Sequence, residues 1–255
     1  MGFMDGWSGK RIERVDLTGA LVRDVDLRGA RFERVVLTGT RMRGVELGHL
    51  TIDGDVEDLV INGVDVAPYV YAELDRRYPD RAKMRPTDSA GFRTAWDILE
   101  CLWDGTVERA RDFSPEQLHE RVDGEWSFIE TLRHLVFATD AWVRRVILGD
   151  PHPWDALDLP FDGMPETPGV PWDRDVRPDL DEVLALRNDR MATVRRYVDE
   201  LTEERLEADT TPVPEPGWPD SVSYPVRDCL LIVLNEEWQH RLYAERDLDL
   251  LETLR

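Results

Sequence analysis

The sequence predicts a mainly α protein, a four-helix bundle with one long crossover loop, preceded by a short β-solenoid. Three observations predict it: a five-residue apolar period near the start, four later stretches with helical periodicity, and a proline-rich segment between the second and third of these. The 255 residues accordingly divide into a solenoid (1–70), a charged linker (71–87) and the bundle (88–255).

The five-residue period belongs to the first segment. Its positions are Ile12, Leu17, Val22, Leu27, Phe32, Leu37, Met42, Leu47 and Ile52. Neither a helix nor a strand has this period, whereas the stacked rungs of a solenoid do. The units VDLTG, ALVRD, VDLRG, ARFER and VVLTG resemble pentapeptide repeats, which implies a short right-handed, four-sided β-helix. Alternating apolar residues over 53–70 predict strands that close it.

The bundle helices are predicted from apolar stripes and from capping signals. The stripes lie within 88–107, 127–148, 179–201 and 226–255. Ser127 and Glu130 form a capping-box pattern at the start of the second stripe, and this helix is apolar on nearly all sides, as expected at the centre of a bundle. A shorter helix is predicted after Ser114 and Pro115.

The proline-rich segment 149–179, called the arm below, contains seven prolines. Loops of this length in a compact domain usually have a function, such as covering a site. Trp154, Phe161 and Trp172 are its expected apolar anchors.

Composition and charge exclude several classes of protein. The chain is 42% hydrophobic and 33% charged, which is typical of a globular protein, and it has no apolar run of membrane-spanning length. Residues 10–52 carry a net charge of +3 and residues 53–255 carry −23, so binding to nucleic acid or to an anionic membrane is not expected. Two cysteines without a disulfide framework, and no signal peptide, predict a cytoplasmic protein.

One polar pattern interrupts the last apolar helix. Within NEEWQHRLYAERDL (235–248), Glu236 and His240 are four residues apart, which puts them on one helix face about 40° and roughly 6 Å apart. His134 lies inside the apolar helix 127–148. An imidazole from one helix with a Glu and a His from another would leave an open position, as in catalytic zinc sites, and the donors also suit nickel or ferrous iron. A solvated surface pair and a core histidine are the alternative interpretation.

These residues also carry a resemblance to a known family. WSFIETLRHLVFATDAWV (126–143) and LNEEWQHRLYAERDL (234–248) resemble the DinB superfamily, four-helix bundles that carry a metal site. Many of its members use three histidines, whereas a branch similar to mycothiol-dependent maleylpyruvate isomerase uses His, Glu and His. The resemblance implies His134, Glu236 and His240 as metal ligands, with Glu236 departing from the three-histidine pattern.

The resemblance further implies an activity. Characterised members are commonly S-transferases or isomerases that use a low-molecular-weight thiol such as mycothiol or bacillithiol on a small electrophile. Tyr243 is a candidate proton donor, with packing as its alternative role.

Cys101 and Cys229 are interpreted as small core residues, and Trp238 as packing away from the site, at a homodimer contact. The competing hypothesis is a non-catalytic scaffold with the repeats as a docking module.

Overall fold

The computed structural model describes residues 9–54 and 56–253. Its contacts divide the chain into two compact units, residues 1–55 and 56–255. The predicted boundary lies at residue 70, whereas residues 56–70 group with the second unit.

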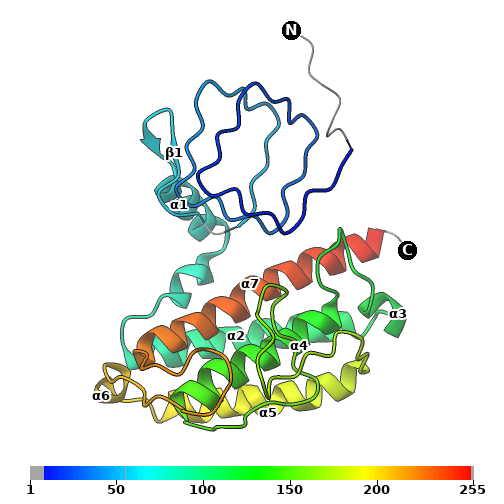
Figure 1. Ribbon diagram of the computed structural model, residues 1–255. Coiled ribbons are helices and arrows are strands. Elements are labelled where there is room, and N and C mark those ends of the chain that lie inside the picture. The colour runs from blue at the N-terminus through cyan, green and yellow to red at the C-terminus, as the bar shows by residue number, and fades with distance from the viewer. Residues whose placement is uncertain (1–8, 55, 254–255) are drawn as a thin grey trace. The chain divides into compact units, whose positions relative to one another are not determined.

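The first unit winds through successive coils, and residues 9–54 contain no regular strand (Figure 1). Its corners have left-handed backbone, with φ of 53–56° at Arg14, Asp24 and Arg34 and 74° at Gly19, Gly29 and Gly39. The corners at Gly19, Gly29 and Gly39 are each closed by a turn bond, such as the 2.9 Å bond from Ala20 N to Leu17 O, so this backbone repeats every ten residues. Apolar side chains of the repeat, including Phe32 at 60%, are exposed. A right-handed β-helix stays a prediction.

The second unit begins with a small hairpin and two helical segments. Strands β1 (Val60–Ile61) and β2 (Val64–Asp65) pair antiparallel around Asn62 and Gly63, whose φ values of 51° and 83° suit a two-residue turn. Helix α1 (Ala67–Arg77) and the 3₁₀ segment η1 (Pro79–Met84) follow. The interval 71–87, expected as a linker, is therefore mostly helical, and η1 packs on α2 and α7 described next.

Four long helices form the bundle (Figure 1). They are α2 (Ser89–Ala110), α4 (Phe128–Thr139) with its continuation η2 (Asp140–Ile147), α5 (Leu180–Asp199) and α7 (Val226–Thr253). Contacts run from α2 to α7, α7 to α4, α4 to α5 and α5 back to α2, which closes the ring. Short helices α3 (Pro115–Leu118) and α6 (Glu203–Leu206) lie in the connections. The predicted mainly α bundle with a long crossover is confirmed.

Helix α4 starts at its predicted capping box. Ser127 Oγ accepts from the backbone N–H of Glu130 at 3.3 Å, and Glu130 Oε2 accepts from the N–H of Ser127 at 2.8 Å. Every residue of α4 except Glu130 is buried, as expected for the central helix. The continuation η2 is a π-helix, and the N–H of Leu148 after it still bonds five residues back to Val143 O at 2.9 Å.

Two proline-rich loops pack on the α4–η2 helix. The arm contributes Met164 and Val170 to a small core with Phe137 and Ala141. The expected anchors Trp154 and Phe161 pack against this core, whereas the third, Trp172, is 37% exposed.

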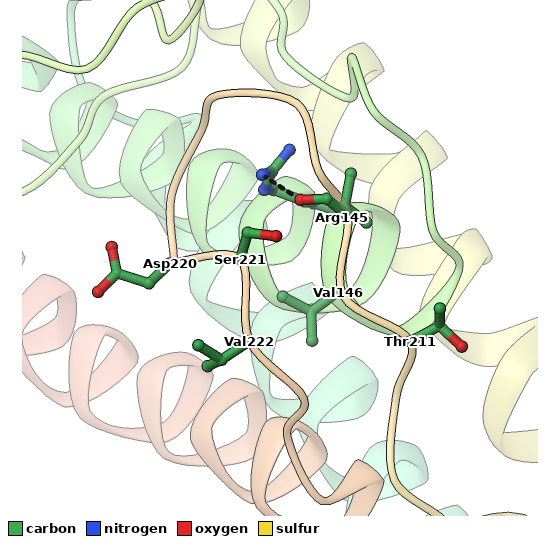
Figure 2. Close-up of a pocket in the computed structure, with 7 residues that line it drawn as sticks. Arg145, Val146, Thr211, Asp220, Ser221 and Val222 are labelled. Atoms are coloured by element: carbon green, nitrogen blue, oxygen red, sulfur yellow. Dashed lines mark hydrogen bonds between the residues drawn. The ribbon is translucent and has the colours of Figure 1, made fainter.

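The second loop runs between α6 and α7 and encloses the guanidinium of Arg145. Figure 2 shows Arg145 pointing into this loop beside Ser221 and Val222, which line a small cavity with it. Its Nη2 donates to Val213 O at 3.3 Å and to Glu215 O at 2.5 Å. The sequence has no periodic pattern in this loop, and the hydrogen bonds from Arg145 hold it in place.

Candidate metal centre

The last helix places Glu236 and His240 side by side, as their spacing predicts. The two residues are one turn apart on α7, and His240 Nε2 lies 3.1 Å from Glu236 Oε2. The Glu236 side chain is 30% exposed and that of His240 is 17% exposed, so the pair lies at the edge of the core rather than in solvent.

His134 joins the pair from α4, which packs directly against α7. Its Nε2 lies 3.3 Å from the same Oε2 of Glu236, and its side chain is only 7% exposed. One donor atom from each of the three residues lies within 4.8 Å of the others. The structure thus brings together all three residues that the sequence singles out.

The contact of His134 Nδ1 determines which nitrogen of the ring carries the proton. Nδ1 lies 2.9 Å from the backbone carbonyl of Leu159 in the arm, and a carbonyl only accepts, so Nδ1 carries the proton. A neutral ring then turns its Nε2 lone pair toward the carboxylate oxygen of Glu236. Two acceptors facing each other require a cation or a second proton between them.

A divalent metal fits this donor set. In tetrahedral zinc sites, bonds of 2.0–2.1 Å place neighbouring donor atoms roughly 3.3 Å apart. The two N–O separations of 3.1 and 3.3 Å agree with this value. A backbone carbonyl that accepts from the non-ligating nitrogen is also the usual support of a metal-binding histidine.

The charges at the site are set by burial and by the mutual contacts. Burial lowers the pKa of His240 below its ordinary value, which keeps the ring neutral and its lone pair free. Burial would raise the pKa of Glu236, but hydrogen bonds and charge from protons on the two imidazoles outweigh burial and hold this pKa well below the ordinary range. The carboxylate of Glu236 is thus ionised, and a metal ion would take the place of the protons between it and the imidazoles, which bind metals in the neutral form.

Aromatic rings surround the cluster. Trp126 stacks on His240 at a centroid distance of 5.8 Å and lies 4.5 Å from the ring of His134. Phe137 lies 6.0 Å from His134, and Tyr243 meets His240 edge-on at 5.9 Å. Sequence reasoning did not single out Trp126 as a site residue; its only signal is its place directly before the capping Ser127.

A buried ion pair lies next to the cluster along α7. Glu237 accepts from Arg187 of α5 through both carboxylate oxygens, at 3.0 and 2.5 Å, and both side chains are at most 2% exposed. The Arg187 guanidinium also lies 4.5 Å from the ring centroid of Trp103. Because Glu237 follows Glu236 directly, this pair fixes the rotation of α7 at the site. Nothing in the sequence distinguished it from an exposed charge.

The remaining histidines do not join the site. His49 and His152 are exposed, and the His119 ring lies 3.0 Å from Pro178 O. Glu130 pairs with Arg121 and makes its capping bond.

Two interpretations of core residues need correction. Cys229 is buried, and burial raises its thiol pKa to about 12, but Cys101 is exposed rather than in the core. Trp238, assigned to a dimer contact, is 3% exposed and packs in the main core of this bundle.

A four-helix bundle with a long crossover and a His–Glu–His cluster between two of its helices defines a class of protein, the bundles that hold a polar site between facing helices. The chain belongs to the DinB superfamily, whose family model matches residues 98–244. Eight copies of the pentapeptide repeat match residues 12–48. No curated protein and no solved structure matches the chain significantly.

Membership of this superfamily indicates the general kind of function. The DinB superfamily is generally metal-binding and is associated with thiol-related enzymes. No helix among the described residues is long and apolar enough to cross a membrane.

Proposed function

We propose that His134, Glu236 and His240 bind one divalent metal ion, zinc in preference to nickel or iron. We further propose that the site activates a low-molecular-weight thiol, of the mycothiol or bacillithiol type, for a transferase or isomerase reaction on a small electrophile. The observation that carries the proposal is the convergence of three donor atoms, with His134 Nδ1 committed to the Leu159 carbonyl and Nε2 directed at Glu236.

A divalent ion at this position would lower the pKa of a thiol that takes its open coordination position, so that the thiolate exists at neutral pH. The thiol sulfur forms a bond to an electrophilic carbon. The thiol proton passes to the group that leaves this carbon, or to the adjacent carbon in an addition.

The residues of the chain supply the remaining conditions. Glu236 is held ionised by positive charge next to it, which protons on the imidazoles supply in the metal-free chain and the metal ion would supply when bound. Trp126 and Phe137 cover the rings of the cluster and limit the access of water. Tyr243 is 40% exposed against the edge of His240, which makes its phenol the candidate proton donor at the open side.

Metal content tests the first half of the proposal. Elemental mass spectrometry of the untagged full-length protein is expected to find about one divalent metal per chain. His240→Ala is expected to lose this metal, and His152→Ala, at an exposed histidine in the arm, is its matched control. The loaded protein is then expected to consume an electrophile only when a small thiol is present.

The opposite result has a defined meaning. A wild-type protein that stays free of metal after incubation with zinc, nickel and ferrous iron contradicts the proposal. The His–Glu–His cluster would then be a polar contact between helices, and the scaffold hypothesis with docking repeats would be favoured.

A further inference from the structure

Arg133, the residue before His134, is completely buried and donates only to backbone carbonyls. Its Nε donates to Leu157 O at 2.8 Å, Nη1 to Val176 O at 3.0 Å and Nη2 to Asp173 O at 2.8 Å. Arg133 is 0% exposed, and no carboxylate of the described residues forms a salt bridge with it. Glu130, Asp158 and Asp173 act on Arg133 electrostatically without a direct ion pair, so its hydrogen bonds to the three carbonyls are its specific contribution.

The three carbonyls belong to distant parts of the arm. Leu157 lies in its first third, and Asp173 and Val176 lie near its end. Because the guanidinium is planar and its donors have fixed directions, one side chain sets the positions of both parts relative to α4. Arg145 shares this pattern toward the second loop, whereas the buried Arg187 and Arg190 are each paired with a carboxylate.

The position of the arm determines the position of the carbonyl that His134 uses. Leu159 is two residues beyond Leu157 and is 1% exposed. Its carbonyl accepts from His134 Nδ1 at 2.9 Å, and its N–H points back to Arg133 O at 3.4 Å. Consecutive residues of α4 thus hold the same short segment, one through its guanidinium and the other through its imidazole.

We propose that Arg133 is a positioning residue for the metal centre: by fixing the arm, it places the Leu159 carbonyl that holds His134 in the Nδ1–H tautomer, with Nε2 free to bind metal. The inference rests on the proposed function. It explains why a charged residue is kept in a helix that is otherwise buried and largely apolar, where an unsatisfied polar group is costly. It also gives the arm a role in metal affinity.

The tautomer itself is the most direct readout. Long-range ¹H–¹⁵N correlation NMR of metal-free, full-length protein distinguishes Nδ1–H from Nε2–H rings, and the chain has only five histidines, so His134→Asn assigns the signal. The wild-type His134 is expected as the Nδ1–H form. Arg133→Met and the milder Arg133→Lys are expected to shift it toward Nε2–H.

Affinity and amide exchange complete the test. Zinc affinity of the Arg133 variants is expected to fall roughly 10- to 100-fold, the range seen when support of a metal ligand is removed. Amide exchange over residues 155–176 is expected to accelerate. Arg93→Met is the matched control, because Arg93 also donates to two backbone carbonyls, Val198 O at 3.2 Å and Leu201 O at 3.0 Å, on other elements. It is expected to leave the tautomer and the affinity unchanged.

Each outcome separates the two proposals. A wild-type His134 in the Nε2–H form overturns the inference without any variant, even if the Arg133 variants do not fold. Folded Arg133 variants that keep tautomer and zinc affinity while the arm exchanges faster also overturn it. A wild-type protein with the Nδ1–H form but no affinity for zinc, nickel or iron contradicts the proposed function, while the positioning of the ring by Arg133 is still tested by NMR.

Discussion

Because the Arg187–Glu237 pair is buried, the loss of unfolding free energy on breaking it can be predicted. Glu237→Gln keeps the shape of the side chain but removes its charge, and it leaves the guanidinium of Arg187 in a place where that side chain is 2% exposed. Breaking a buried pair from one side costs about 3–5 kcal/mol, because the remaining charge is neither solvated nor paired. The bundle is expected to lose this amount of unfolding free energy.

Urea denaturation followed by tryptophan fluorescence measures the loss. Eight of the nine tryptophans lie within residues 56–255, so the signal reports on the bundle unit. With a typical slope of about 2 kcal/mol per molar urea, the midpoint is expected to fall by roughly 1.5–2.5 M. Glu73→Gln is the control, since Glu73 is 41% exposed and pairs with Arg76 on the surface, where such contacts contribute about 0–1 kcal/mol.

A double variant distinguishes the loss of a partner from the loss of packing. Replacing both members, as Arg187→Met with Glu237→Leu, removes the unpaired charge and is expected to restore most of the stability. A Glu237→Gln protein that loses less than about 1 kcal/mol would refute the reasoning. So would a double variant that is no more stable than Glu237→Gln alone.

Three further predictions follow from the site and its supports. Burial keeps the pKa of His240 below the ordinary 6.5, so the unfolded chain binds a proton that the folded metal-free chain does not; its unfolding free energy should fall as pH drops through about 6.5, a slope that His240→Asn should remove. Cobalt or nickel should quench the fluorescence of Trp126, 4.5 Å from the ring of His134, and Trp126→Phe should lose most of the response while still binding metal by elemental analysis. Gly217→Ala should destabilise by about 1–3 kcal/mol, because its Cβ would lie 2.7 Å from Arg145 Cζ, whereas Gly105→Ala, in an open position of α2, should stabilise by about 1 kcal/mol in the same melts.

The helices of the bundle were predictable because their signals are local. The capping box at Ser127 and the apolar stripes fix where α4 and α7 begin and which residues they bury. The cluster was predictable for a related reason: Glu236 and His240 share a face by helix geometry alone. That His134 faces them came from the family resemblance, because spacing within one helix says nothing about a partner helix.

Other features of the site have no local signal. The carbonyl of Leu159 is a backbone atom, and any residue at that position would supply it. Arg187 lies in a charged stretch, where an arginine is usually exposed, and only the packing of α5 buries it. Arg133 lies in an apolar helix, but the sequence does not show that carbonyls of the arm meet it. Cys101 was misassigned because its apolar neighbours Leu99 and Trp103 share the helix but not its face.

The π-helical segment η2 changes the direction in which side chains point at the end of the α4–η2 helix. A π-helix holds one more residue in a turn than an α-helix does, and each residue turns an α-helix by about 100°. His134 thus faces α7, while Arg144, one residue before Arg145, still reaches Asp150 at the start of the arm at 2.8 Å. Removing one residue between 140 and 147 should restore α-helical geometry and rotate the end of this helix out of phase with both loops. The metal-binding half would keep its orientation and the bonds from Arg133 to the arm, whereas the start of the arm would lose Arg144 and the second loop would lose Arg145.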